Sequence, residues 1–404
     1  MKKILIGGSP CTHWSIAQKN NRETTAEGIG WELFKNYLIA KEKFQPDYFL
    51  YENNKSAAQP IKDQISIELG VPLQYINSAL VSAQNRQRFY AHNMPDVPQP
   101  EDRGILLRDI LETGEAWREK AYTLDANYYK TGGTYNPKKQ HSYSRHMVAE
   151  PIKHLSEKEM EYMVRQTKDG RNHFDFGHYS NSIDDKSHAV TANISKGVPY
   201  NVLTEPVRIG SIGSNSQTHR VYSSDGKSVN LVANGGGQGA KTGLYACPVE
   251  KSGKQHPVYE VKNGLITIKD KQYPIKLADG FYIIRKLTVT ECCRLQTMPD
   301  EYCRAVSASQ AYKGLGNGWT AEVIIHILRH MNIPLDEEII VLSMYDGIGT
   351  GRYCFDKLGY KNIQYCAYEI DKYAMQVAMS NYPDIIQCGD AFQVREDGWG
   401  IGRR

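Results

Sequence analysis

The C-terminal part of this 404-residue chain has the pattern of a parallel sheet that stops one strand short. From about residue 339 it reads strand, glycine turn, helix, strand, acidic residue, helix, strand, and no fourth strand follows. Residues 2–6 supply a short apolar strand at the other end of the chain. Successive βα units add parallel strands to one sheet, so we predict a single parallel sheet with the two chain ends side by side. The order of the segments indicates a circular permutation.

Length and composition are those of an ordinary globular protein with two lobes. Hydrophobic residues make up 40% of the chain and charged residues 23%, and the net charge of +4 says little about partners. No stretch is long enough to span a membrane or has the form of a secretory signal. The eight cysteines include no Cys-x-x-Cys pair. We therefore expect a cytoplasmic protein without a metal site.

Three segments can be distinguished along the chain. Residues 1–95 alternate between strand and helix patterns, and residues 286–404 return to this α/β pattern. Residues 96–285 begin with a Pro-rich linker and are rich in Gly, Asn, Ser and Tyr, which is typical of short strands and turns. We predict an α/β lobe built from the two outer segments, with a mainly-β domain inserted between them.

Local periodicity predicts several elements. Apolar residues at helical spacing from Ile29 to Ala40 predict a helix that Pro46 stops, and a strand follows over 48–51. Further predicted elements are helices over 57–69, 156–166 and 320–331, a short helix starting at 287–291, and a strand over 73–80. A loose repeat at 120–132, 186–197 and 227–243 either presents three basic turns on one edge or reflects similar hairpins without a common role.

A cysteine on a glycine-rich loop is the first candidate for chemistry. Cys11 ends the sequence Gly-Gly-Ser-Pro-Cys, directly after the first strand. A thiolate attacks best when a rigid, partly open loop presents it, and a proline just before it fixes the backbone. A lone cysteine on a loop is more often a bystander, so the residues alone leave both roles open.

Charged side chains follow two further strands, at the edge where an open α/β sheet binds ligands. Glu52 could protonate a ring nitrogen as a buried acid, or it could cap the helix that follows. Arg86 and Arg88 alternate so that they point to one face. Two guanidinium groups there suit a phosphate or a carbonyl oxygen, and they also fit a solvated basic edge.

The stretch 345–351 has the form of a glycine turn between a strand and a helix. Glu369 ends the next strand, about 23 residues after Asp346, which suits a carboxylate that accepts from ribose hydroxyls. Asp390 follows the third strand and offers another acceptor. The glycine spacing is not that of dinucleotide-binding proteins, so an adenosyl ligand other than NAD is favoured.

Together these segments resemble the motifs of the C5-cytosine DNA methyltransferases, over most of the chain outside 100–280. The matching segments are 7–11, 52–54, 84–88, 287–296, 316–319, 345–351, Glu369 and Asp390. The cofactor motifs come last, as in permuted members of the family. Asn54 and Tyr345 stand where the family usually has Val and Phe, and His13-Trp14 replaces its commoner continuation.

The resemblance implies a Rossmann-like, S-adenosylmethionine-dependent methyltransferase sheet, circularly permuted, with an inserted mainly-β target-recognition domain. It implies a monomer that acts on double-stranded DNA in the bacterial cytoplasm, at the nucleoid. It also implies a separately acting restriction endonuclease as a partner.

The family chemistry assigns a role to each catalytic candidate. Cys11 would add to C6 of a flipped-out cytosine, which makes C5 able to take the methyl group. Glu52 would hold N3 and the exocyclic amine. Arg86 and Arg88 would reach the cytosine carbonyl and either the phosphate or the catalytic loop, with the division between them left open.

The resemblance also implies a site for S-adenosyl-L-methionine. The residues implied for the cofactor are Pro10, Asn317, Tyr345, Asp346, Gly347, Ile348, Gly349, Glu369, Ile370 and Asp390. Tyr345 would stack on the adenine, or would be a core residue. Glu369 would accept from the ribose hydroxyls, and Asp390 from the adenine amine.

Basic residues of the middle segment are candidates for DNA contact. The stretch 130–146 combines basic and aromatic side chains without an acidic residue, which fits phosphate contact as well as a solvated loop. The residues implied for DNA binding are Ser9, Lys130, Lys138, Lys139, Arg145 and Lys241.

Three other functions remain as alternatives. A tRNA cytosine methyltransferase would not need so long a recognition segment. A catalytically silent DNA-binding homologue would not need to retain Cys11, Glu52, Arg86 and Arg88. A NAD-dependent enzyme leaves the Pro-Cys loop unexplained.

Overall fold

The computed structural model describes the two outer segments of the chain and short strands between them. The described residues are 1–15, 22–116, 119–124, 126, 128, 147–151, 174–175, 208–211, 220–223, 244–246, 255–256, 258–268 and 271–399.

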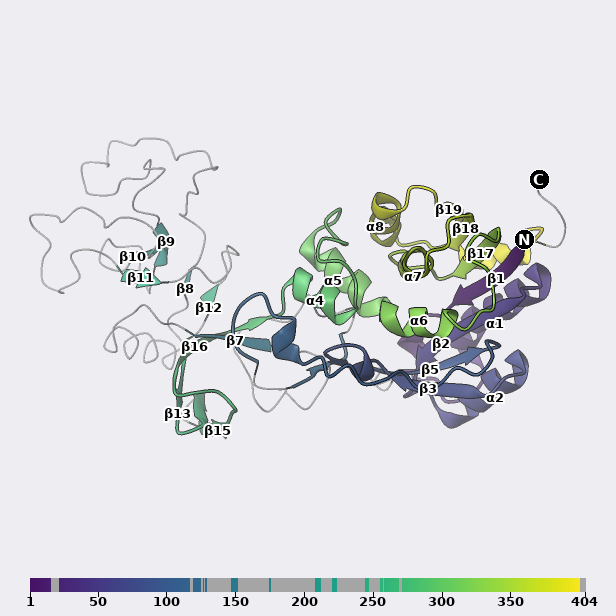
Figure 1. Ribbon diagram of the computed structural model, residues 1–404. Coiled ribbons are helices and arrows are strands. Elements are labelled where there is room, and N and C mark those ends of the chain that lie inside the picture. Colours follow the sequence, from purple (N-terminus) through teal and green to yellow (C-terminus); the bar gives the residue numbers. More distant parts are fainter. Residues whose placement is uncertain are drawn as a thin grey trace, which may run out of the picture.

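A seven-stranded sheet organises the described part of the outer segments, in the order β19-β18-β17-β1-β2-β5-β3 (Figure 1). Its strands are β1 (Lys2–Gly7), β2 (Tyr48–Asn54), β3 (Leu73–Asn77), β5 (Gln87–His92), β17 (Ile339–Met344), β18 (Ile363–Tyr368) and β19 (Ile386–Gly389).

The first strand of the chain lies at the centre of this sheet. β1 pairs in parallel with β17, where Lys2 lies opposite Ile339. On its other side β1 pairs in parallel with β2, where Ile4 lies opposite Tyr48. The prediction that the N-terminal strand continues the C-terminal run is confirmed.

The two ends of the described chain meet at one aromatic ring. Lys3 Nζ lies 5.4 Å from the centroid of the Phe44 ring. The Trp399 ring packs edge-on against the same ring, with 5.8 Å between centroids. Segments from opposite ends of the chain therefore lie side by side, as predicted.

One edge of the sheet departs from the parallel arrangement that the sequence predicts. β5 runs antiparallel to both β2 and β3. A 3₁₀ turn, η2 (Ser78–Leu80), and the two-residue β4 (Gln84–Asn85) are all that lies between β3 and β5. A parallel neighbour would need a crossover of a dozen or more residues, so this short connection forces the reversal and the sheet is mixed.

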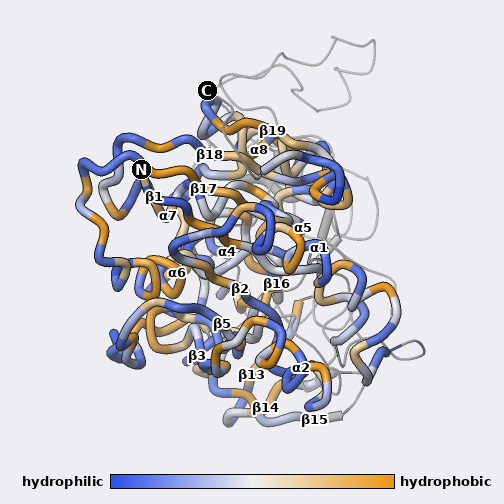
Figure 2. Tube along the Cα trace, turned by 90° about the vertical axis from the view of Figure 1, so that its right-hand side faces the viewer, coloured by the Kyte–Doolittle hydropathy of each residue, from blue (hydrophilic) through white to orange (hydrophobic). Residues whose placement is uncertain are grey.

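Alternating side chains place the sheet between two apolar layers. Ile4 and Ile6 of β1 belong to a hydrophobic cluster on one face, and Leu5 belongs to a second cluster on the other. All three are 0% exposed. Figure 2 shows the apolar residues concentrated along these strands. A strand buried on both faces reads as a continuous apolar run, which is the pattern of β1.

Helices cover both faces of the sheet. The α-helices are α1 (Gly28–Phe44), α2 (Gln59–Leu69), α4 (Val289–Leu295), α5 (Ala308–Asn317), α6 (Ala321–Leu328), α7 (Thr350–Leu358) and α8 (Lys372–Asn381). Residues of α1 and α2 join the cluster around Leu5, and residues of α5, α6, α7 and α8 join the cluster around Ile4. Short 3₁₀ turns include η1 (Cys11–His13), η3 (Leu107–Asp109) and η8 (Ala391–Arg395).

The first predicted helix is confirmed in α1, and its buried face includes Tyr37 and Ala40 as the spacing predicts but not Ile29. Trp31, Phe34 and Tyr37 are buried, whereas Ile29 is 61% exposed. The buried side chains are aromatic and pack against one another, with ring centroids 4.8 Å apart for Trp31 and Phe34. The aromatic residues Trp31 and Phe34 therefore extend the buried face of α1 beyond the positions that the apolar spacing from Ile29 predicts.

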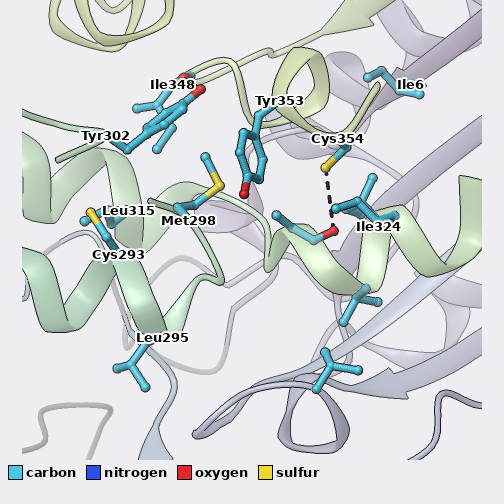
Figure 3. Close-up of a cluster of buried hydrophobic side chains, with 14 of the residues drawn as sticks. Ile6, Cys293, Leu295, Met298, Tyr302, Leu315, Ile324, Ile348, Tyr353 and Cys354 are labelled. Atoms are coloured by element: carbon cyan, nitrogen blue, oxygen red, sulfur yellow. Dashed lines mark hydrogen bonds between the residues drawn. The ribbon is translucent and has the colours of Figure 1, made fainter. Parts of the chain in front are cut away.

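The predicted helix over 320–331 is confirmed in the shorter α6, and its apolar face packs against α7. Val323 and Ile324 are 0% exposed. The Cys354 thiol of α7 donates to the Ala321 carbonyl at 3.6 Å, within the cluster that Figure 3 shows. The preceding helix, α5, was not predicted, because its glycines and polar residues obscure the apolar spacing.

A buried ion pair fixes the start of α4. Thr288 and Glu291 form a capping box, in which Thr288 Oγ1 accepts from the Glu291 backbone N–H at 3.1 Å. Arg285 donates to both carboxylate oxygens of Glu291 at 2.9 Å, and the two side chains are 2% and 0% exposed. Removing one partner of a buried pair costs about 3–5 kcal/mol. The pair therefore sets the orientation of α4 at the end of β16 (Gly280–Lys286).

The described part of the middle segment consists of short strands, as predicted. β7 (Met147–Pro151), β13 (Val258–Lys262), β14 (Leu265–Ile268), β15 (Lys271–Pro274) and β16 form an antiparallel sheet in the order β15-β14-β13-β16-β7. Smaller sheets contain β6 (Ala121–Tyr122), β8 (Phe174–Asp175), β9 (Arg208–Ser211), β10 (Arg220–Ser223), β11 (Leu244–Ala246) and β12 (Gln255–His256). The predicted helix over 156–166 and the repeats at 186–197 and 227–243 lie outside the described residues. Within the described ranges, no helix has the length and apolar character to cross a membrane.

Candidate active site

A cavity of about 630 Å³ lies where the parallel strands of the large sheet end. Open α/β sheets bind ligands at this edge. The predicted site residues that line the cavity are Ser9, Pro10, Cys11, Glu52, Arg86, Arg88, Asn317, Tyr345, Asp346, Gly347, Glu369, Ile370 and Asp390. Residues predicted from opposite ends of the chain thus share one cavity.

The Pro-Cys loop follows β1 through two glycines that admit no side chain. A Cβ on Gly7 would lie 2.7 Å from the Met344 carbonyl oxygen, and a Cβ on Gly8 would lie 2.7 Å from the Glu52 carbonyl oxygen. Both distances are too short for any side-chain carbon. The close approach brings the loop against the ends of β17 and β2.

Buried hydrogen bonds hold the start of this loop. The hydroxyls of Ser9 and Tyr51 are 2.7 Å apart, and Asn53 Nδ2 donates to the Ser9 carbonyl at 3.0 Å. Ser9 is 4% exposed. The resemblance implies a DNA contact for Ser9, but the structure gives its hydroxyl to Tyr51, so Ser9 anchors the loop.

The other end of the loop is anchored through Trp14. Cys11 lies on η1, and its carbonyl accepts from the backbone N–H of Trp14 at 3.1 Å. Trp14 is 0% exposed, and its indole N–H donates to Glu23 Oε2 at 3.1 Å. Glu23 also accepts from the backbone N–H of Gly30 in α1. Cys11 is therefore presented from a loop fixed on both sides.

Two side chains from different segments of the chain, those of Arg88 and Trp319, contact the carboxylate of Glu52. Arg88 Nε lies 2.8 Å from Glu52 Oε1, and the indole N–H of Trp319 donates to Oε2 at 3.0 Å. The side chains of Arg88 and Glu52 are 13% and 11% exposed. Glu52 lies at the end of β2 and does not cap α2, whose N-cap residue is Ala58.

Arg86 and Arg88 both reach the cavity but have different partners. Arg86 is 3% exposed and donates to the carbonyls of Leu124 and Gly318, each at 2.8 Å, and of Gly316 at 3.3 Å. Burial, and then the neighbouring Arg88 guanidinium, lower the pKa of Arg86 to about 9, so it remains charged at neutral pH. Its donors serve backbone carbonyls and so brace the 316–318 turn, while the division of substrate contacts between Arg86 and Arg88 stays open.

The turn after β17 has an unusual backbone at its first residue. Tyr345 has φ of 61°, a left-handed conformation that is uncommon outside glycine. Its hydroxyl donates to the Leu33 carbonyl of α1 at 2.7 Å and accepts from Asn36 Nδ2 at 3.3 Å. Burial raises the pKa of Tyr345 to about 12. The hydroxyl, absent from the phenylalanine usual here in the family, fixes the turn to α1.

Asp346 places an unpaired carboxylate oxygen beside the cavity. Its Oδ1 accepts from Ser343 at 2.7 Å and from Tyr365 at 2.6 Å, whereas its buried Oδ2 has no hydrogen-bond partner within the described residues. Burial raises the pKa of Asp346 to about 6. A cationic or hydrogen-bonding ligand group would satisfy this oxygen.

Glu369 organises the glycine turn as well as facing the cavity. Its carboxylate accepts from the backbone N–H groups of Gly347, Ile370 and Asp371, each at 2.8 Å. A carboxylate offers about four acceptor positions. After three backbone bonds, Glu369 retains capacity for about one ribose hydroxyl, fewer than the predicted pair.

Two residues predicted for cofactor binding are absent from the cavity wall. Ile348 is 2% exposed and packs against α5, where a Cβ on Gly314 would lie 2.6 Å from it. The carbonyls of Ile348 and Gly349 accept from the Tyr302 hydroxyl, near which Figure 3 draws Ile348. The side chain of Ile348 points into the core, so a contact from Ile348 or Gly349 to the cofactor would come from the backbone and stays a prediction.

The part of the cavity lined by α8 and η8 contains residues that the sequence did not single out. Phe392 and Tyr373 line it and are 40% and 36% exposed. Lys313 of α5 pairs with Asp371 of α8 at 2.6 Å, and both also line the cavity. Apolar residues shortly after an acidic strand end were the available signal for Phe392.

The hydrogen-bond acceptors in the cavity fit S-adenosylmethionine. Asp346 Oδ2, Glu369 and Asp390 offer acceptors for an amino group, a ribose and an adenine amine, and the partly exposed rings of Tyr373 and Phe392 line the same cavity. The residues implied for DNA contact in the middle segment, Lys130, Lys138, Lys139, Arg145 and Lys241, lie outside the described residues.

Comparison with known proteins gives an independent result. The chain matches the family model described as C-5 cytosine-specific DNA methylase over residues 1–332. It is 24% identical to the Orphan methyltransferase M.SPRI of Bacillus phage SPR over 393 residues, which covers 81% of this chain and 82% of that protein. It is 33% identical to the Type II methyltransferase M.HhaI of Haemophilus parahaemolyticus over 125 residues, which covers 31% of this chain and 27% of that protein.

Proposed function

Because this chain belongs to the C-5 cytosine-specific DNA methylase family and is a DNA cytosine methyltransferase, we propose that it works through a covalent bond between Cys11 and C6 of a flipped-out cytosine. The observation that carries the proposal is that Cys11, Glu52 and Arg88 line one cavity with Asp346 and Glu369. A nucleophile, an acid and a set of acceptors for an adenosyl group thereby line the same cavity.

The reaction begins with addition to the base. Cys11 Sγ forms a bond to C6, the π electrons of the C5–C6 bond move toward N3, and Glu52 gives N3 a proton. Arg88, which holds Glu52 Oε1 at 2.8 Å, is placed to stabilise charge on the base. C5 now has enamine character and is nucleophilic.

The second half of the reaction transfers the methyl group and restores the ring. Bound S-adenosylmethionine would supply an electrophilic methyl group. C5 forms the new carbon–carbon bond as the bond between the methyl carbon and sulfur breaks, and that electron pair stays on sulfur, so the leaving group is the neutral thioether S-adenosylhomocysteine. Water removes the C5 proton, the double bond re-forms, and Cys11 leaves as a thiolate while Glu52 recovers its proton from N3. The net change is methyl for hydrogen at C5, with one proton released.

The finer parts of the proposal concern the rest of the chain. Residues 96–285 would recognise the target sequence, and the basic residues of 130–146 and Lys241 would contact phosphate. The enzyme would act as a monomer at the nucleoid, as a circularly permuted member of its family. It would serve restriction-modification beside a separate endonuclease, or self-protection of a phage genome.

The reaction is tested with S-adenosylmethionine that carries a labelled methyl group. Purified protein is incubated with unmethylated duplex DNA or with tRNA, and the bases are separated after digestion. We expect label in 5-methylcytosine from DNA. Label confined to tRNA would move the substrate to RNA, and the absence of label from both would contradict the proposed reaction.

A further inference from the structure

We propose that Trp319 is a positioning residue for Glu52, and that Arg86 acts through the turn that carries Trp319. The inference rests on the proposed function, because it assigns Glu52 to the cytosine. It extends that function by a contact between residues 267 positions apart in the chain.

The contact fixes both oxygens of one carboxylate from opposite directions. Trp319 donates to Oε2 at 3.0 Å, and Arg88 Nε forms an ion pair with Oε1 at 2.8 Å. The terminal torsion of a glutamate side chain is soft and roughly two-fold, so one donor alone leaves the carboxylate plane free to turn. The hydrogen bond and the ion pair together define the plane, and with it the direction in which Glu52 faces a bound base.

The indole is itself held by buried hydrogen bonds to the backbone beside it. Arg86 donates to the carbonyls of Gly316 and Gly318, the residues just before Trp319. Gln296, which is 1% exposed, donates to the Leu315 carbonyl at 2.5 Å. The forked guanidinium can serve two carbonyls at once, which a lysine ammonium does less well.

The same turn touches the cofactor side of the cavity. Gly314 of α5 has room for no side chain beside Ile348, and Trp319 and Asn317 line the cavity together with Glu52. The turn therefore lies between the carboxylate that faces the base and the glycine turn after β17. A shift at either end would be transmitted to the orientation of Glu52.

Loss of the indole N–H should impair the chemical step more than binding. A misdirected catalytic group lowers kcat, whereas contacts made equally in the ground state and transition state appear in KM. Hydrogen bonds to charged groups are the stronger ones, so we expect Trp319→Phe to lower the single-turnover rate of methyl transfer by about tenfold or more. The KM values for DNA and S-adenosylmethionine should change by about twofold or less.

A double-mutant cycle separates positioning from a structural role. In a Glu52→Ala background the carboxylate is gone, so Trp319→Phe should add less than about a twofold loss of rate. The control is Tyr360→Phe, which removes a buried hydroxyl that donates to the Ile333 carbonyl at 3.1 Å, away from the cavity. This control should leave the rate unchanged.

A second variant tests whether a loss of rate in Trp319→Phe comes from lower stability of the protein. A benzothienylalanine at position 319 keeps the bicyclic shape and removes only the N–H, and the same rate loss is expected. An unchanged rate in this variant, or an equal loss in the Glu52→Ala background, would overturn the inference. If the wild-type protein transfers no methyl group, it is the proposed function that fails.

Discussion

The buried carboxylate of Asp346 lowers the stability of the folded protein and can be satisfied when a ligand binds. Asp346 has one oxygen satisfied by Ser343 and Tyr365 and one buried oxygen without a partner among the described residues. Burial raises its pKa from an ordinary 3.8 to about 6. An uncompensated buried charge costs folding free energy that a ligand can recover on binding.

The pH dependence of stability follows from this shift. Below 3.8 Asp346 is neutral in the folded and unfolded chains, and above about 6 it is charged in both. Between these values the folded protein binds more protons, so stability falls as the pH rises. The difference in unfolding free energy between Asp346→Asn and wild type should therefore increase by about 2 kcal/mol in favour of the variant from pH 4.5 to pH 7.5.

Denaturant unfolding of both proteins at the two pH values measures this difference. Asp300→Asn is the control with the opposite sign, because hydrogen bonds from Arg294 hold the pKa of Asp300 below its ordinary value. Calorimetry should show weaker binding of S-adenosylmethionine to Asp346→Asn. A difference in unfolding free energy from wild type that is the same at both pH values would contradict the raised pKa of Asp346.

At the scale of elements, β1 is the central strand of the sheet although it is the first in the chain. It has a parallel neighbour on each side, β17 and β2, and the Pro-Cys loop begins where it ends. The connection from α6 to β17 is exposed at Leu335, which is 52% accessible. The strands can therefore keep their positions in the sheet when the order of the segments along the chain is changed.

A permuted chain tests this separation. A protein that starts at residue 336, runs to 404, continues through a flexible linker into residue 1 and ends at 335 should fold and keep methyl transfer within about threefold, since exposed connections tolerate new ends. The ion pair between the Met1 amine and Glu337 that this change disturbs is exposed and worth little. A control cut after Leu342, inside the buried β17, should abolish folding. Loss of structure with the cut at 335 would contradict the account of β1.

At the scale of the whole molecule, the positions of the site residues at strand ends could be predicted, because the hydrophobic pattern of each segment shows where its strand ends. Alternating strand and helix signals placed Cys11 and Glu52 at strand ends, and the membership of β1 in the C-terminal parallel sheet was inferred from the missing strand, although its pairing with β17 was not. The antiparallel direction of β5 was not predicted, because the strand pattern over 73–80 gave no signal for a second strand after a short connection. The partners of Arg86 were also missed, since charge alone does not tell a carbonyl from a phosphate.

The contact of Trp319 with Glu52 marks the limit of inference from pattern. Both residues lie in segments that the sequence singled out, but only the packing of α5 against the turn after β17 brings them together. Likewise, the hydroxyl that distinguishes Tyr345 from phenylalanine has its partners on α1. Such contacts depend on side-chain positions that spacing does not encode.

The central claim is the covalent bond between Cys11 and the base, and a mechanism-based trap tests it most directly. Duplex DNA in which 5-fluorocytosine replaces cytosine has no C5 proton to lose, so the chain should stay attached after methyl transfer. The account predicts an adduct that survives denaturation, maps by mass spectrometry to the peptide containing Cys11, and is absent from Cys11→Ser. An adduct on another residue, or methyl transfer to ordinary DNA by Cys11→Ser at the wild-type rate, would contradict it.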